Sequence, residues 1–230
     1  MEHKIIKKRK SSALKWFLLI IILLITSVLV LVNNSRFQHY LAGKVSAKAT
    51  DALGVPVSIE RIGLGHYLRF KLHNVLVLDH QMDTLAKATQ INLRLSEVNT
   101  VSKVIRFSDI MAQDLRFGLI THPGDTVPNL TMITERLKDT TKKESAPWKF
   151  QIGSAALNNC RFILENRNEA ATTQGMDFNY LDASRINARI DRFNVEDDTI
   201  YADIKYLSAL ERSGFFLKQL SSDLRVSSTG

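Results

Sequence analysis

The side chains of this 230-residue chain that could do chemistry are one cysteine, six histidines and several acids in predicted turns. A metal site needs several ligands at a fixed spacing, such as two histidines four residues apart on a helix. The nearest approach is the group His73, His80 and Asp83, which has no such spacing and no second set of ligands. We therefore expect no metal site and no cofactor.

A catalytic constellation is also not predicted. Cys160 is the only cysteine, which excludes an intrachain disulfide, and its apolar neighbours favour a small buried side chain over a reactive thiol. The turn acids have no base at a fixed spacing; they are Asp79, Asp83, Asp197 and Asp198. No GxSxG, Walker A, GxGxxG, HExxH or CxxC motif occurs. The sequence predicts a protein that is not an enzyme, with no catalytic residues.

The elements that would position these residues begin with an apolar segment over 13–32. Lys15 is its only charged residue, and as a helix it would be about 30 Å long, the thickness of a bilayer core. A basic tail, 1–12, precedes it and predicts a cytoplasmic N-terminus with residues 33–230 on the far side of the membrane. A cleavable signal peptide is the alternative, but the apolar run is long and no small-x-small cleavage site follows.

The positive charge is concentrated at this end of the chain. Residues 1–36 hold seven Lys or Arg and one acid, a net charge of +6, which leaves +2 of the total +8 for the rest. Such basicity is a topology signal with some affinity for anionic lipid heads. We expect no nucleic-acid partner.

An amphipathic helix is predicted over 33–54, directly after the anchor. Its apolar residues recur every three or four positions, and Gly54 followed by Pro56 ends the pattern. Two interpretations are open: the helix packs on the following sheet, or it lies on the membrane surface.

Two blocks of β structure, 55–121 and 148–230, are predicted, separated by a short helix and linker over 122–147. Apolar residues alternate with polar ones in each block, as in Ile91–Leu95, and short turns separate the runs. This favours a mainly β fold of antiparallel strands with one apolar face. Because the chain stops at Gly230 directly after a strand pattern, we expect a truncated second block that continues in a longer array.

The order of these segments resembles the N-terminal part of the AsmA-like family of envelope proteins. The segments that carry the resemblance are Asp51–Gly54, Val57–Ile62, Leu72–Asp79, Asp83–Ala88, Asn194–Ala202 and Ser208–Phe215. The resemblance implies a taco-like antiparallel β-groove in the periplasm, anchored in the inner membrane, along which phospholipid moves in outer-membrane biogenesis. It also implies an Omp85-type outer-membrane barrel protein as a partner.

The residues predicted to face the lipid are apolar ones that repeat every second position in consecutive runs. They are Ile91, Leu93, Leu95, Leu115, Phe117 and Leu119. The same pattern is typical of an ordinary dry core, so period alone does not decide between the two. A second hypothesis is a scaffold without lipid that recruits the outer-membrane partner for protein insertion or translocation through a sheet edge. A third, an envelope hydrolase or sensor, has no nucleophile–base pair to support it.

Overall fold

The computed structural model describes residues 33–65, 67–138, 149–172, 175–196 and 199–227, together with Leu23 and Val30. The predicted basic tail (1–12), nearly all of the predicted anchor (13–32) and residues 139–147 of the predicted helix and linker lie outside the described residues. Within the described part, no helix has both the length and the apolar character that crossing a membrane requires.

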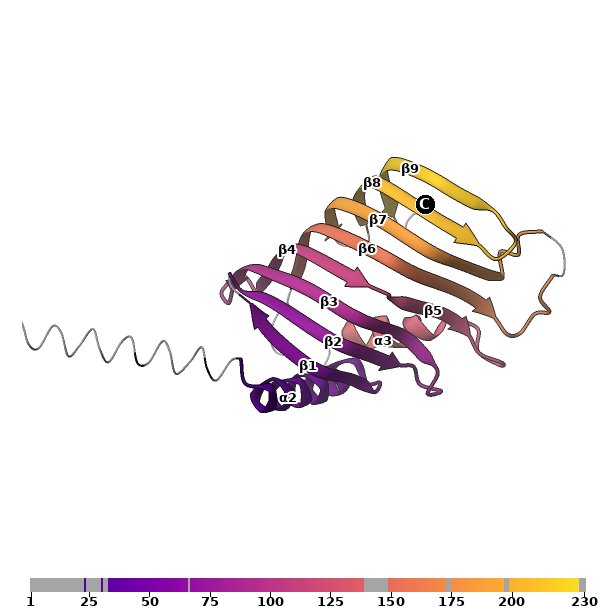
Figure 1. Cartoon of the computed structure of the whole chain (residues 1–230). Helices are drawn as coiled ribbons and strands as arrows, with labels where there is room; N and C mark the ends of the chain where they lie inside the picture. The colour runs from indigo at the N-terminus through magenta and orange to yellow at the C-terminus, as the bar shows by residue number, and fades with distance from the viewer. Residues whose placement is uncertain are drawn as a thin grey trace, which may run out of the picture.

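The described residues form a mainly β fold built on one nine-stranded mixed sheet, with the strands side by side from β1 to β9 in Figure 1. The strands are β1 (Val57–Gly65), β2 (Arg69–Leu78), β3 (Thr84–Asn99), β4 (Val104–Gln113), β5 (Arg116–Thr121), β6 (Lys149–Asn166), β7 (Tyr180–Glu196), β8 (Thr199–Glu211) and β9 (Phe216–Ser227). The two β blocks that the sequence predicts are therefore hydrogen-bonded to each other.

The prediction of antiparallel strands throughout is wrong at the junction of the two blocks. β6 pairs in parallel with both β4 and β5, whereas the other strand pairs are antiparallel. A parallel pair needs a long crossover connection. The chain between Thr121 and Lys149 includes helix α3 (Asn129–Lys138), and it brings β6 back to start beside Val104.

β4 and β5 act as one strand that is broken at Asp114. Both pair with β3 on one side and with β6 on the other, and Asp114 between them has a left-handed φ of 50°. The sequence did not predict β4. Its apolar Phe107 and Ile110 are three residues apart, because a register shift opposite Leu95 interrupts the two-residue alternation.

A row of hydrogen-bonded polar residues crosses the sheet at this break, and we name it the bend seam: Thr89, Asp114, Asn159 and Asn187. Asp114 accepts bonds from Thr89 Oγ1 (2.9 Å) and Asn159 Nδ2 (2.7 Å), and Asn187 Oδ1 accepts from the Asn159 backbone N–H (3.0 Å). Asn159 itself has φ 53° beside a register shift between β6 and β7. Such bulges bend strands, and the strands in Figure 1 are visibly bent along their length.

Two helices accompany the sheet. Helix α2 (Ser35–Leu53) begins after Asn34, whose side chain accepts the Arg36 N–H, and it ends at Gly54 with φ 73°. Left-handed backbone favours glycine, so the end of the helix is where the sequence predicts it. α2 packs on β1 and α3 on β5 (Figure 1). Of the two interpretations of α2, packing on the sheet is the one the structure supports.

Candidate functional site

One face of the sheet carries apolar side chains in rows that run across the strands, and we name it the apolar face. From Leu93 in β3, the register leads to Ile110, Ala155, Ile190 and Ile204 in β4, β6, β7 and β8. A parallel row consists of Ile91, Ala112, Leu157, Ala188, Leu207 and Leu220. Cross-strand partners share a face of a sheet, so each row is a continuous apolar strip.

The first part of the apolar face is covered by the helices. Ala42 of α2 is buried and forms one hydrophobic cluster with Ile59 of β1 and Val75 of β2. Under α3, Ile133 packs with Leu85 in a second cluster. Ile133 is 5% exposed and Ala42 is fully buried. Over β1, β5 and the parts of β2 and β3 that contact these two clusters, the apolar face is therefore an ordinary dry core.

The second part of the apolar face, on β6 to β9, lies outside the helix contacts. Its larger apolar side chains, such as Ile190, Phe193 and Ile204, are half-buried. Leu220 and Leu224 on β9 are 40% and 42% exposed. Half-buried apolar chains in a row indicate a surface on which no second layer of the described residues lies.

The six residues predicted to face lipid fall in three groups. Ile91 packs against the α2 cluster, and Phe117 packs against the α3 cluster and stacks on Phe162 with ring centroids 6.2 Å apart. Leu93, Leu95 and Leu119 are half-buried and have apolar partners across the strands, namely Ile110, Phe107 and Leu164. Leu115 precedes β5, and its carbonyl accepts the Arg161 N–H at 2.8 Å. The structure thus gives Ile91 and Phe117 a core role.

The opposite face of the sheet is polar and held by ion pairs. Arg94 lies 3.1 Å from Asp109 across β3 and β4. On β8, Lys205 and Arg192 both contact Asp203, and these bonds hold the pKa of the Asp203 carboxyl below its ordinary value. The exposed Arg94–Asp109 pair contributes little stability, whereas Asp203 is 7% exposed and has two cationic partners.

A buried polar cluster closes one end of the sheet, and we name it the corner cluster: Asp79, His122 and Asn129. Asp79 and His122 are 0% and 1% exposed, and His122 Nε2 lies 2.7 Å from Asp79 Oδ2. Asn129 Nδ2 donates to the same oxygen (2.9 Å), and Asn129 Oδ1 accepts the Ile120 N–H (3.1 Å). Burial raises the pKa of Asp79, but the bonds from Asn129 and His122 outweigh it, so the pKa is lowered overall.

The corner cluster is structural in character. Asp79 Oδ1 accepts the backbone N–H groups of Gln81 and Asp83 (both 2.9 Å), which shapes the turn between β2 and β3. The sequence singled out Asp79 as a turn acid but missed His122 and Asn129, which lie 43 and 50 residues away from it. Among the described residues, no group of His, Cys, Asp or Glu is arranged to hold a metal ion.

The thiol of Cys160 is buried, as the sequence predicts. It is 3% exposed, and Sγ lies 3.8 Å from the Ala112 carbonyl oxygen. Burial raises the pKa of this thiol above its ordinary value, so the reactive thiolate is disfavoured.

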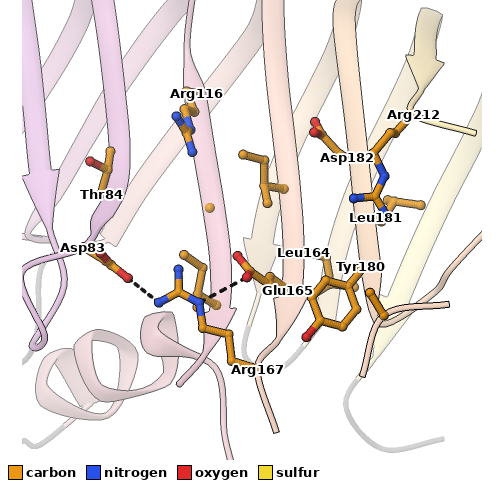
Figure 2. Close-up of a pocket in the computed structure, with 14 residues that line it drawn as sticks. Asp83, Thr84, Arg116, Leu164, Glu165, Arg167, Tyr180, Leu181, Asp182 and Arg212 are labelled. Carbon is orange, nitrogen blue, oxygen red and sulfur yellow. Dashed lines mark hydrogen bonds and ion pairs between the residues drawn. The ribbon is translucent and has the colours of Figure 1, made fainter. Parts of the chain in front are cut away.

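A pocket of about 460 Å³ lies beside the corner cluster, between β5, β6 and β7 (Figure 2). At one end of it, Arg167 bridges Asp83 (2.6 Å) and Glu165 (3.2 Å). At the other end, Arg116 and Arg212 lie on either side of Asp182. Sequence reasoning missed this pocket, because its residues come from five separate segments.

The comparisons with known proteins give no identity to these features. A search with protein-family models finds no match to the chain, and a search of curated proteins finds no significant relative. The described residues are characterised by a mainly β sheet whose apolar face is covered by helices over one part only.

Proposed function

We propose that the protein is anchored in the inner membrane and carries phospholipid acyl chains along the apolar face, in the periplasm, toward the outer membrane. In this proposal the bent sheet is one segment of a taco-like β-groove, as in the TamB branch of the AsmA-like family. The apolar segment 13–32 is the anchor and the polar face meets water. No covalent chemistry is required of any residue.

The observation that carries the proposal is the unbroken row from Leu93 to Ile204. An apolar row that continues past the helices is costly unless something apolar contacts it, since each buried methylene contributes about 0.8 kcal/mol. Acyl chains lying across the strands would contact successive members of the row. The polar face offers no such path, because its strands carry ion pairs such as Arg94–Asp109.

The test uses the full chain purified in a neutral detergent and two substitutions that add the same charge to the same strand. Ile204→Glu places a carboxylate on the apolar face, whereas Tyr206→Glu places it on the polar face, where Tyr206 pairs with Arg189. We expect co-purifying phospholipid, measured by native mass spectrometry, to fall at least fivefold in Ile204→Glu and to stay unchanged in Tyr206→Glu. Equal phospholipid content in both variants, or no phospholipid bound to the parent chain, would contradict the proposal.

A scaffold without lipid is the second candidate, and the edge of the sheet favours it. β9 pairs with β8 on one side, and no strand among the described residues pairs with its other side. β9 also exposes Phe216, Leu220 and Leu224, which suits the addition of a strand from an Omp85-type barrel partner.

Photo-crosslinking separates the two candidates. A photoreactive residue at Ile204 or Leu93 is expected to trap lipid if the apolar face is a path. Under the scaffold hypothesis, the same positions would trap no lipid, and a photoreactive residue at Leu220 would trap a protein partner.

A further inference from the structure

We propose that the pocket between β5, β6 and β7 binds a phosphate group through Arg116 and Arg212. This site is separate from the proposed lipid path. Along β5, Arg116, Gly118 and Ile120 alternate with Phe117 and Leu119, and Phe117 packs toward the α3 cluster. Side chains alternate between faces along a strand, so the pocket opens on the polar face.

The carboxylates of the pocket are already occupied by other arginines. Both carboxylate oxygens of Asp182 accept a hydrogen bond from Arg161: Oδ1 from Nε (2.7 Å) and Oδ2 from Nη2. Those bonds are the main reason why the pKa of Asp182 is lowered. Asp83 and Glu165 share Arg167 (Figure 2). Each acid therefore already contacts a guanidinium group of another arginine.

Arg116 and Arg212 remain as excess positive charge. No carboxylate lies within ion-pair distance of either guanidinium in the described part of the chain, although both lie near enough to Asp182 to act on its pKa through charge. The residues that line the pocket include three guanidiniums and three carboxylates, and Arg161, which is not a lining residue, neutralises Asp182. The positive charge is concentrated at the Asp182 end, because at the other end one arginine is shared by two acids.

The shape of the pocket suits a tetrahedral anion with an apolar substituent. Guanidinium groups offer paired N–H donors that match two oxygens of a phosphate. The cavity of about 460 Å³ exceeds what a bare phosphate fills, and Ile163 and Ile120 add apolar lining. The phosphate could belong to a free ion or to a lipid head group, and the chemistry of recognition is the same.

The experiment measures binding to the full chain in a neutral maltoside detergent. One probe is inorganic phosphate, followed by ³¹P NMR line broadening, and the other is dihexanoyl phosphatidic acid. We expect saturable binding that weakens at least tenfold in the double variant Arg116→Gln/Arg212→Gln. The control, Arg189→Gln/Arg225→Gln, removes the same charge from exposed arginines outside the pocket and should bind as the parent does.

A third variant guards against a folding artefact. Arg116→Lys/Arg212→Lys keeps the charge but loses the paired donors, so its affinity should lie between those of the parent and the Gln variant. Tighter binding of the lipid probe than of phosphate assigns the site to a head group, and similar binding assigns it to free phosphate. The proposal fails if the parent shows no saturable binding of either probe, or if the control pair weakens binding equally.

Discussion

The two parts of the apolar face have the same sequence pattern but different surroundings. On β1, β5 and the adjoining parts of β2 and β3, the helices α2 and α3 bury residues such as Ile59 and Leu85 almost completely. On β6 to β9, the equivalent residues Ile190 and Ile204 are half-buried, and the described helices pack on β1 and β5 instead. The comparison teaches that alternation specifies which face is apolar, whereas the neighbouring amphipathic helices decide which part of that face is dry.

The largest difference should appear when one isoleucine is shortened in each part. We expect Ile133→Ala to lower the free energy of unfolding by about 3 kcal/mol, since it opens a cavity in a closed cluster. Ile204→Ala should cost about 1 kcal/mol, because that side chain is already partly in contact with solvent. Urea unfolding followed by circular dichroism measures both. Equal losses would mean that β6 to β9 are as well covered as the strands under α2 and α3.

The corner cluster supports the covered part, since Asn129 joins the start of α3 to β5 and to Asp79. Asp79→Asn should lower the free energy of unfolding by about 2–3 kcal/mol, because it weakens buried bonds to His122 and Asn129. The control, Asp83→Asn, removes an exposed partner of Arg167 and should cost less than about 1 kcal/mol.

The pH dependence of stability tests the role of Asp79 in a second way. Because the pKa of Asp79 is lower in the folded than in the unfolded chain, its ionised form favours folding at neutral pH. That contribution is complete above the ordinary aspartate pKa and disappears as the pH falls through the lowered value. The stability difference between the parent and Asp79→Asn should therefore shrink in acid. A difference that is constant from pH 7 to pH 3 would contradict this role.

Much of the fold follows from local pattern. Helix α2 was predictable from its apolar spacing and from Gly54, and most strands from period-two alternation. β4 was not predictable, because a bulge places Phe107 and Ile110 three residues apart. The parallel pairing of β6 was also not predictable. The connection after Thr121 must return to the start of β4, and no local sequence signal specifies that path.

The candidate site was predictable only in part, for a related reason. Leu93 and Leu119 are found by alternation, but helix cover over Ile91 and Phe117 depends on tertiary packing. The corner cluster and the phosphate pocket combine residues far apart in the sequence. Arg116 and Arg212, for example, are 96 positions apart, and neither lies in a recognisable motif. A buried His122 could have been suspected only from its apolar neighbours, which is a weak signal.

The bend seam joins the covered and uncovered parts, and we expect a substitution in it to have a smaller effect on the free energy of unfolding. Asn159 has a left-handed backbone, which costs a β-branched residue about 1–2 kcal/mol. We expect Asn159→Val to lose about 2 kcal/mol of unfolding free energy, which includes its bond to Asp114. Asn159→Gly keeps the backbone conformation and should lose about 1 kcal/mol or less, by the same urea titration. If Asn159→Val lowers the free energy of unfolding no more than Asn159→Gly does, the bend does not depend on this residue.

The smallest expected effect concerns Cys160, a buried thiol in the uncovered part. Its labelling by a disulfide reagent should be slow in the native chain, because the thiol is buried and its pKa is raised. If β6 opens locally, without the helices unfolding, Ile133→Ala should change the labelling rate less than twofold under native conditions. If labelling instead requires global unfolding, a loss of 3 kcal/mol should accelerate it by roughly 150-fold, at tenfold per 1.4 kcal/mol. Such an acceleration would show that the two parts unfold as one cooperative unit, and the distinction between them would then concern surface cover alone.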